Sequence, residues 1–461
     1  MARKSIVVFV LLIVVGGIIN AQQPGADGLG DSLFPGLGNG GYDVQHYTID
    51  LAWDSDTGAI DATATIEATA TQDLSAFNLD LIGLEVERVS VDDIEATFTR
   101  DGREMTITPA EPIANESAFI VLIDYNGVPE PLVDGGAPVP IGWINYEGGV
   151  YTVSEPSGSA TWYPVNDHPL DKATYTFRIT APKPFTVAAN GLPREQIDNG
   201  ATTTFVWEAS DPIASYLTTV NIGEYDIQEE EGPNGLPIIN YFERGLPSSA
   251  IENFALTSDM IAFYSEIFGP YPFESYGAVV INANFPAALE TQTRSVFGPR
   301  ATGQTTIAHE LVHQWFGNSV SPADWSDIWL NEGFAEYLSY LWIAETAGEE
   351  AFLREMNRNY NFIASSNFSA FGGTAPGNAG ADNLFNPGVY VWGAWTLHAL
   401  RLTVGDDIFF KILQTYAAEF RNGTATTEDF ITIAEEVSGE ELGDFFQAWL
   451  FGDSVPDQPA T

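Results

Sequence analysis

Two histidines one helical turn apart, with a glutamate beside them, are the residues of this chain best suited to chemistry. His309 and His313 stand four positions apart, so on a helix both imidazoles lie on one face and can bind one metal ion. Glu310 follows His309, where its carboxylate can polarise a water that the metal holds. Glu332, further along the chain, supplies a third ligand. Two histidines and a carboxylate leave the fourth position of tetrahedral Zn²⁺ open, which is typical of a catalytic site.

Two amphipathic helices are predicted to position these side chains. Apolar periodicity predicts the first helix over residues 304–316 and the second over residues 329–347. On the second helix, Glu336 lies one turn after Glu332 and on the same face. Histidines that bind a metal usually donate their other ring N–H to an acceptor, so we predict that Glu336 accepts such a bond. The alternative is that Glu336 is an ordinary exposed acid of the helix.

Changes in composition along the chain predict two domains behind a leader. Residues 1–21 have the basic start and apolar run of a secretory signal, which predicts an exported protein, extracellular or in the cell envelope. A leader left uncleaved would be its membrane anchor. Residues 22–41 are rich in Gly, Asp and Pro and predict a flexible lead-in. Period-two alternation predicts an all-β domain over residues 42–222, and helical periodicity predicts a second domain over residues 223–461. The expected fold class is therefore α+β.

Shorter patterns give more local expectations. Ser249 with Glu252, and Ser438 with Glu441, have the spacing of capping boxes that begin helices. Residues 367–388 are rich in Asn, Gly and Ala, which predicts a loop at the border of the cleft.

The charge of the chain is strongly one-sided. It has 63 acidic and 17 basic residues, a net charge of −46. Such a surface repels nucleic acid and anionic membranes, so neither is expected as a partner. Adaptation to high salt and a generally acidic exported protein explain the excess equally well. The chain has no cysteine, which excludes disulfides and thiol nucleophiles. No pattern in the sequence indicates an oligomeric state.

Three further segments give the chain a resemblance to a known family. They are residues 162–173 (WYPVNDHPLDKA), residues 287–291 (AALET) and residues 389–394 (VYVWGA). Together with HELVH and a glutamate after an eighteen-residue gap, residues 314–331, they resemble the aminopeptidase N family of gluzincin zinc peptidases. The likeness is to a short bacterial-type form without the large C-terminal helical domain. It implies a saddle-like N-terminal β domain followed by a thermolysin-like, mainly helical peptidase domain.

The resemblance also implies roles for single residues. One Zn²⁺ per chain would be bound by His309, His313 and Glu332, with Glu310 as the base. Tyr390 would donate its hydroxyl to the oxyanion, and Glu290 and Glu155 would hold the substrate's free α-amino group. Mn²⁺ or Co²⁺ could occupy the same ligands.

One segment departs from the family pattern. Where the family has GxMEN, Ala287, Leu289 and Thr291 replace the Gly, Met and Asn. Leu289 keeps an apolar contact, but Ala287 adds a Cβ where a substrate backbone would approach closely.

The predicted function is zinc-dependent removal of the N-terminal residue of peptides. Zinc lowers the pKa of its bound water to about 7, and Glu310 would take the proton. Two carboxylates near the metal favour one ammonium group, and an internal peptide segment carries none. The expected partners are therefore peptides with a free N-terminus. Three alternatives stay open: a gluzincin endopeptidase, an epoxide hydrolase of the leukotriene type, and a non-catalytic peptide-binding protein.

Overall fold

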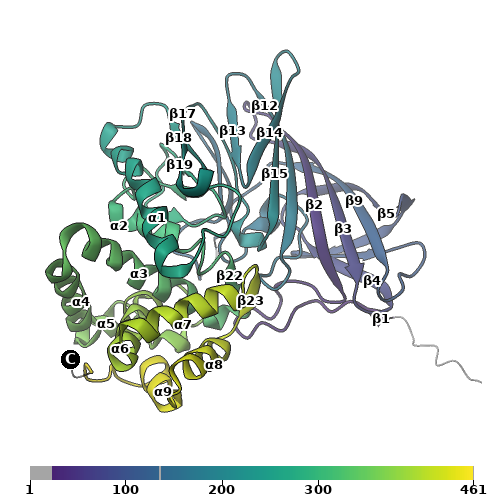
Figure 1. Ribbon diagram of the computed structural model, residues 1–461. Helices are drawn as coiled ribbons and strands as arrows, with labels where there is room; N and C mark the ends of the chain where they lie inside the picture. The colour runs from purple at the N-terminus through teal and green to yellow at the C-terminus, as the bar shows by residue number, and fades with distance from the viewer. Residues whose placement is uncertain (1–22, 134–135, 460–461) are drawn as a thin grey trace, which may run out of the picture.

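The computed structural model describes residues 23–133 and 136–459 of the chain. The predicted leader, residues 1–21, lies outside the described part, within which no helix has the length and apolar character needed to cross a membrane. The N-terminal half is built from β-sheets and the C-terminal half is mainly helical (Figure 1). The α+β class expected from the sequence is confirmed. The domain boundary predicted between residues 222 and 223 stays a prediction.

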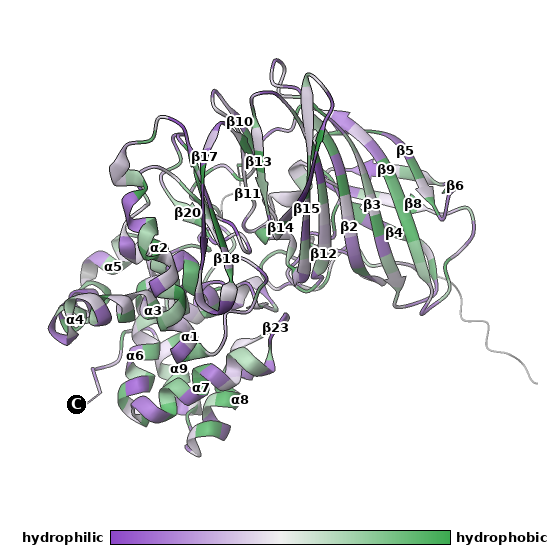
Figure 2. Cartoon of the chain, turned by 45° about the horizontal axis from the view of Figure 1, so that its top comes forward, coloured by the Kyte–Doolittle hydropathy of each residue, from purple (hydrophilic) through white to green (hydrophobic). Residues whose placement is uncertain are grey.

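An eight-stranded sheet forms the largest layer of the N-terminal half. Its strands run in the order β14 (Leu192–Asp198), β15 (Thr202–Ile213), β12 (Ala173–Pro182), β2 (Tyr42–Trp53), β3 (Ile60–Ala70), β9 (Ala118–Gly127), β5 (Glu85–Val91) and β6 (Ile94–Glu95). Apolar residues alternate along β2 and β3, and so does burial, because successive side chains of a strand point to opposite faces. Figure 2 shows this alternation as bands of different hydropathy along the strands.

Two four-stranded sheets complete the β half. One has the order β1 (Gln23–Pro24), β4 (Leu74–Asp80), β8 (Glu104–Thr108), β7 (Thr97–Asp101). It packs on the large sheet through Phe77 of β4, whose ring lies 5.7 Å from Tyr42 and 5.3 Å from Phe119. The other has the order β10 (Gly142–Tyr146), β11 (Gly149–Val153), β16 (Val220–Gly223), β13 (Thr186–Ala189). Strand β11 leads directly into the segment that carries Glu155.

The C-terminal half combines a small sheet with a helical layer. The sheet has the order β17 (Tyr225–Glu231), β18 (Pro237–Glu243), β19 (Ala278–Val280), β21 (Ser295–Phe297), β20 (Ala288–Leu289). The helices are α1 (Thr257–Phe268), α2 (Gln304–Val312), α3 (Trp329–Ala347), α4 (Glu349–Ile363), α5 (Ser366–Ala370), α6 (Gly393–Val404), α7 (Asp406–Glu419), α8 (Thr427–Ser438) and α9 (Gly443–Phe451). A short parallel pair, β22 (Val320–Pro322) and β23 (Gly423–Ala425), ties the end of the α2 region to the segment before α8.

Helix α3 is the central element of this layer. It is buried along most of its length and packs against α2, α4 and α6. Phe334 of α3 lies 5.1 Å from Phe316, 5.8 Å from Tyr416 and 5.0 Å from Phe430, measured between ring centroids. This aromatic cluster holds α3 against the turn that follows α2, so the two elements that carry the predicted metal ligands keep a fixed relation.

The structure corrects several local expectations about helices. Helix α2 ends at Val312 instead of residue 316, because the backbone turns there: the Asn318 amide donates to the His313 carbonyl and Phe316 forms a β-bridge with Val320. The two predicted capping boxes are wrong. Ser249 lies in a 3₁₀ turn ahead of α1, and Ser438 is the last residue of α8, with its hydroxyl bonded to a carbonyl of that helix. The predicted loop over residues 367–388 contains most of α5.

The segment before residue 42 also differs from its expectation. The sequence predicted a flexible lead-in over residues 22–41, but residues 23–41 pack against both halves of the molecule. The Asp31 carboxylate accepts from the Trp325 amide at 2.7 Å and lies 3.2 Å from the His168 ring. Ser32 donates through its amide and its hydroxyl to Asp324, at 2.8 and 2.6 Å. The polar residues that made this segment look like a loop bond to groups far away in the chain. Composition alone does not reveal such contacts.

Candidate active site

A cavity of about 330 Å³ lies where the two halves meet, and it collects the predicted site residues. From the β half it receives Glu155 and the apolar side chains of Val139, Ile141 and Val153. From the helical half it receives the other site residues predicted from the sequence: Glu290, His309, Glu310, His313, Glu332, Glu336 and Tyr390. Phe285, Leu289 and Phe385 form apolar walls. Every site residue predicted from the sequence therefore borders one cavity.

Three of these side chains form a group that suits a metal ion. Ligand atoms of His309, His313 and Glu332 all lie within 4.8 Å of one another. One Glu332 oxygen is 3.2 Å from His309 Nε2 and 3.5 Å from His313 Nε2. Ligands at ~2.0–2.1 Å around a tetrahedral zinc ion are about 3.3 Å apart, so the spacing of these atoms fits zinc. Glu332 comes from α3 and the histidines from α2 and its C-terminal cap.

The other nitrogen of each imidazole has its own acceptor. His309 Nδ1 lies 3.3 Å from the Glu336 carboxylate, and His313 Nδ1 lies 3.1 Å from the carbonyl of Phe316. These contacts favour protonation at Nδ1 in both rings, which leaves each Nε2 lone pair directed at the common point. Tyr340 donates to Glu336, and the Asn359 side chain donates to the Tyr340 hydroxyl at 3.0 Å, so α4 fixes the carboxylate in turn. Glu336 thus lies close to His309 Nδ1, and its role as the acceptor of that N–H stays a prediction.

Glu310 lies beside the two histidines, but it is not part of the group that His309, His313 and Glu332 form. Its side chain is buried in the cavity wall, and burial raises the pKa of its carboxyl group to about 8. Burial would raise the pKa of Glu332 as well, but the His313 and His309 imidazoles lower it to about 2. Glu332 is therefore suited to bind a cation, and Glu310 is suited to exchange a proton near neutral pH.

Glu155 and Glu290 reach the cavity from opposite halves of the molecule. Each side chain is buried, and one oxygen of each, Oε1, has no hydrogen-bond partner among the described residues. Burial, together with the charge of Glu290, raises the pKa of Glu155 well above its usual value, and burial likewise raises the pKa of Glu290. Glu290 Oε1 lies 4.0 Å from His313 Nδ1, which is beyond hydrogen-bond distance. Buried carboxylate oxygens without a hydrogen-bond partner are costly, so the arrangement of these two groups suits a cationic ligand.

The backbone around Glu290 is held by side chains that follow the histidines. Its carbonyl accepts from Gln314 Nε2 at 3.1 Å and from Asn318 Nδ2 at 2.7 Å. Strand β20 ends just before Glu290 and pairs with β21, with Leu289 opposite Val296. Sequence reasoning missed Gln314 and Asn318, and the signal that could have found them is their position in the turn after the HExxH motif.

Tyr390 lies on an irregular turn of helix. Residues Gly388–Trp392 form a single π-helical turn ahead of α6, a local geometry that often accompanies functional sites. The Tyr390 ring is nearly parallel to that of His309, at a centroid distance of 6.2 Å. Burial, with Glu332 nearby, raises the pKa of the Tyr390 hydroxyl, which therefore stays protonated and can donate a hydrogen bond.

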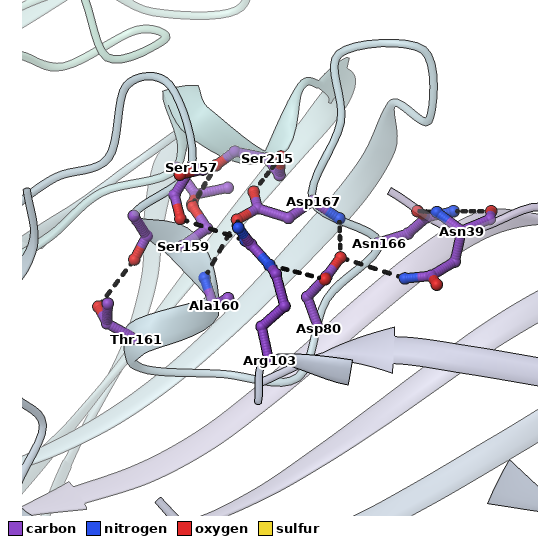
Figure 3. A network of polar contacts seen from close by, with 12 residues as sticks. Asn39, Asp80, Arg103, Ser157, Ser159, Ala160, Thr161, Asn166, Asp167 and Ser215 are labelled. Atoms are coloured by element: carbon purple, nitrogen blue, oxygen red, sulfur yellow. Dashed lines mark hydrogen bonds and ion pairs between the residues drawn. The ribbon is translucent and has the colours of Figure 1, made fainter. Parts of the chain in front are cut away.

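A polar network of the β half supports the segment that carries Glu155 (Figure 3). Arg103 is paired with Asp80 at 3.0 Å and with Asp167 at 3.1 Å, and both carboxylates are fully buried. The same guanidinium lies 3.5 Å from the Ser157 carbonyl, two residues after Glu155, and Asp167 accepts from the Ala160 amide at 3.4 Å. Sequence reasoning missed Arg103. Its partner Asp167 lies within the WYPVNDHPLDKA segment, but no pattern in the sequence links the two residues.

The fold and the site have the features of gluzincin metallopeptidases, with an HExxH motif that begins on one helix and a glutamate near it on the next helix. Residues 252–449 match the Peptidase family M1 domain and residues 43–217 match the Peptidase M1 N-terminal domain. The chain belongs to peptidase family M1, also called the aminopeptidase N family, as the resemblance in the sequence implied.

Individual relatives agree with this assignment. The chain is similar to the crystal structure of an M1 zinc metallopeptidase from Deinococcus radiodurans, with a TM-score of 0.87 and 31% identity over 94% of this chain and 99% of that one. It is 26% identical to Aminopeptidase M1-A of Oryza sativa subsp. japonica over 95% of its own length, and 29% identical to Aminopeptidase N of Streptomyces lividans over 65%. The chain spans only 53% and 38% of the lengths of these two curated relatives.

Proposed function

We propose that this protein is a zinc-dependent aminopeptidase that removes the N-terminal residue of peptides. The observation that carries the proposal is the pair of buried carboxylates of Glu155 and Glu290 beside the His309, His313 and Glu332 group. Each has one oxygen without a hydrogen-bond partner in residues 23–133 and 136–459. A free α-ammonium supplies the positive charge that these carboxylates lack, whereas an internal peptide segment would leave them unpaired. Among solved relatives, a mutant of the Deinococcus radiodurans metallopeptidase was crystallised with a Tyr-Ser-Ala substrate, which supports a peptide ligand.

The roles of the metal ligands follow from their donor atoms. His309, His313 and Glu332 would hold one zinc ion, since two imidazoles and a carboxylate suit it and leave a coordination position open. When bound, zinc supplies Lewis-acid polarisation of a carbonyl and activation of water. Glu336 and the Phe316 carbonyl keep the imidazoles in the tautomer that directs Nε2 at the ion.

The remaining site residues move protons and orient the peptide. Glu310 accepts a proton from the attacking water and returns it to the departing amine, for which a pKa near neutrality is favourable. The Tyr390 hydroxyl donates to the carbonyl oxygen as negative charge builds on it. Glu155 and Glu290 hold the α-ammonium and so place the first peptide bond, and not a later one, beside Glu310.

A panel of fluorogenic aminoacyl substrates, each with a free and an N-acetylated form, tests the proposed function. We expect hydrolysis of the free forms, loss of activity with a chelator and recovery on adding zinc. Glu290→Gln should raise KM or lower kcat for free-amine substrates and change little for blocked ones. Preference of the wild-type protein for blocked internal peptides would instead show an endopeptidase, and no turnover by zinc-loaded protein would favour a peptide-binding role.

Substitution of Glu310 separates metal binding from catalysis. Glu310→Gln should retain zinc, because Glu310 is not one of the three ligands, and should lose peptide hydrolysis by several orders of magnitude. Zinc content by elemental analysis and kcat on a free-amine substrate are the two measurements. Glu350→Gln, whose side chain is 95% exposed on α4, serves as the matched control. Substantial turnover by the Glu310→Gln protein would remove Glu310 as the base.

We also propose that the protein is exported, which rests on residues 1–21 of the sequence. Fractionation of cells that express the full chain, with N-terminal sequencing of the exported product, tests this. Retention of the whole chain in the cytoplasm would contradict it.

A further inference from the structure

The cavity holds a second group of potential ligands in addition to the zinc group. Glu155, Glu290 and Glu332 each offer an oxygen, and these atoms all lie within 4.8 Å of one another. The three residues are 5%, 2% and 4% exposed, so water covers little of their charge. They come from three different elements: the segment after β11, the end of β20 and helix α3. A group assembled from such distant parts of the chain is specified by the tertiary structure.

This group is poor in positive charge. The Oε1 atoms of Glu155 and Glu290 have no hydrogen-bond partner in the described part of the chain, and both residues line the cavity. No lysine or arginine is among the described residues that line it. Glu310 adds a fourth buried carboxyl group to the same wall. When the four carboxyl groups are ionised, their negative charge exceeds the charge of a single zinc ion, and a second cation stabilises the ionised forms.

We propose that, in the absence of peptide, Glu155, Glu290 and Glu332 bind a second divalent cation of the oxygen-preferring class, such as Mn²⁺. This inference rests on the proposed function and adds a form of regulation to it, since the cation would occupy the place of the substrate's ammonium group. A donor set made only of carboxylates suits Mn²⁺, Mg²⁺ or Ca²⁺, whereas the neighbouring set with two imidazoles suits zinc. The cavity of about 330 Å³ has room for the waters that complete such a coordination shell.

Electron paramagnetic resonance of Mn²⁺ added to the zinc-loaded protein counts the bound ions directly. We expect one more tightly bound Mn²⁺ per chain in the wild-type protein than in Glu155→Gln or Glu290→Gln, with zinc content unchanged in all three. The acidic surface also takes up Mn²⁺, so Glu350→Gln, an exposed acid removed elsewhere, is the control and should retain the extra ion. Equal uptake by the wild-type protein and both cavity variants would overturn the proposal.

Displacement provides a second measurement that does not depend on the variants folding. Leucinamide, which has a free amine, should release the tightly bound Mn²⁺ from the wild-type protein, and N-acetyl-leucinamide should not. In kinetics, Mn²⁺ should raise KM for free-amine substrates several-fold and leave kcat unchanged. Release by both amides, or a fall in kcat without a change in KM, would contradict the proposal. If blocked and free substrates were cleaved equally, the proposed function would fail, while the Mn²⁺ count would still decide this inference.

Discussion

Four glutamates of the cavity differ in pKa and in hydrogen bonding because their neighbours differ. Burial raises the pKa of Glu332, but its contacts with the His313 and His309 imidazoles outweigh burial and lower the pKa to about 2. Glu310 is buried with weaker compensation, and its pKa rises to about 8. Burial raises the pKa values of Glu155 and Glu290, and Oε1 of each has no hydrogen-bond partner among the described residues, which suits a cationic ligand. The proposed division into metal ligand, base and amine anchor thus rests on differences in local charge and burial.

At the residue scale, removal of one hydroxyl tests the role of Tyr390. Tyr390→Phe should lower kcat by about 10²–10³, the range for loss of one donor to a developing oxyanion, with little change in KM. Zinc content should stay at the wild-type level. Tyr360→Phe removes a hydroxyl that bonds to the Pro456 carbonyl and serves as the control. A Tyr390→Phe protein with near wild-type kcat would show that the hydroxyl does not stabilise the reacting carbonyl.

At the scale of elements, the placement of the site residues depends on side chains that lie outside the cavity. Helix α3 carries Glu332 and Glu336, and its position is set by the aromatic cluster around Phe334. The segment with Glu155 has no regular structure for several residues. Arg103, in the turn between β7 and β8, supports it together with Asp80 at the end of β4 and Asp167 in the loop before β12. In both cases, packing away from the cavity fixes the position of a carboxylate inside it.

Substitution of Arg103 tests the support of the Glu155 segment. Arg103→Met leaves Asp80 and Asp167 buried without a cation, which should cost about 3–5 kcal/mol of folding stability in urea titrations. It should also raise KM for free-amine substrates more than for N-acetylated ones, because Glu155 loses its position.

Two companion proteins control the Arg103 experiment. Arg88→Met removes a guanidinium that is 59% exposed and paired with Asp124, and should cost at most about 1 kcal/mol. Arg103→Met combined with Asp80→Asn and Asp167→Asn should recover much of the lost stability, since no buried charge is left. A full loss of stability without any change in the ratio of KM values would limit Arg103 to a structural role.

The contact between α3 and α6 should make stability depend on pH. His398 of α6 is buried and lies 3.2 Å from the Tyr337 hydroxyl of α3; burial, with Arg401 nearby, lowers its pKa to about 4. The unfolded chain therefore binds the proton first as pH falls below about 6.5. The stability that depends on neutral His398 is fully present above pH 6.5 and is lost as pH falls through 4. The loss in the free energy of unfolding is on the order of 3 kcal/mol.

Comparison of two proteins isolates this effect from other acid titrations. The wild-type free energy of unfolding, measured by urea titration between pH 7 and pH 4, should fall more steeply than that of His398→Gln. Parallel curves for the two proteins would show that His398 does not take part in the linkage.

At the scale of the whole molecule, charge and connectivity are the dominant features. The net charge of −46 is spread over a molecule whose two halves are held together by buried polar contacts. Examples are the bonds from Lys172 to the carbonyls of Asn318 and Ser319, at 2.9 and 3.1 Å, and from Tyr216 to the Gly317 carbonyl at 3.0 Å. Repulsion among surface carboxylates opposes the compact state, whereas these contacts are shielded from solvent and from salt.

Added salt should therefore stabilise the protein. We expect the midpoint of urea unfolding to rise between 0.05 and 1 M NaCl, since the Debye length falls from over 10 Å to about 3 Å. KCl at equal ionic strength should act alike, because the effect is one of screening. A midpoint that is flat or falls with added NaCl would contradict both this expectation and the interpretation of the acidic composition as salt adaptation.

The residue types and their spacing were sufficient to predict the family and the class of fold. The four-residue spacing of His309 and His313 specifies a shared face wherever the segment is helical, because helical geometry is local. Alternation of apolar residues similarly predicted β2 and β3, since side chains of a strand alternate between faces. The exact ends of helices were less predictable: α2 stops at Val312 because of hydrogen bonds formed by the turn beyond it.

The convergence of Glu155, Glu290 and Glu332 on one cavity required the assembled molecule. Each lies on a different element, and their distances depend on how the β half packs against the helical half. No local pattern could show that Arg103 supports the Glu155 segment, or that Asp31 bonds to the Trp325 amide, because these contacts join residues far apart in the chain. Local rules specify which side chains a helix or strand presents; burial, unpaired charge and the cavity itself arise only when such elements pack together.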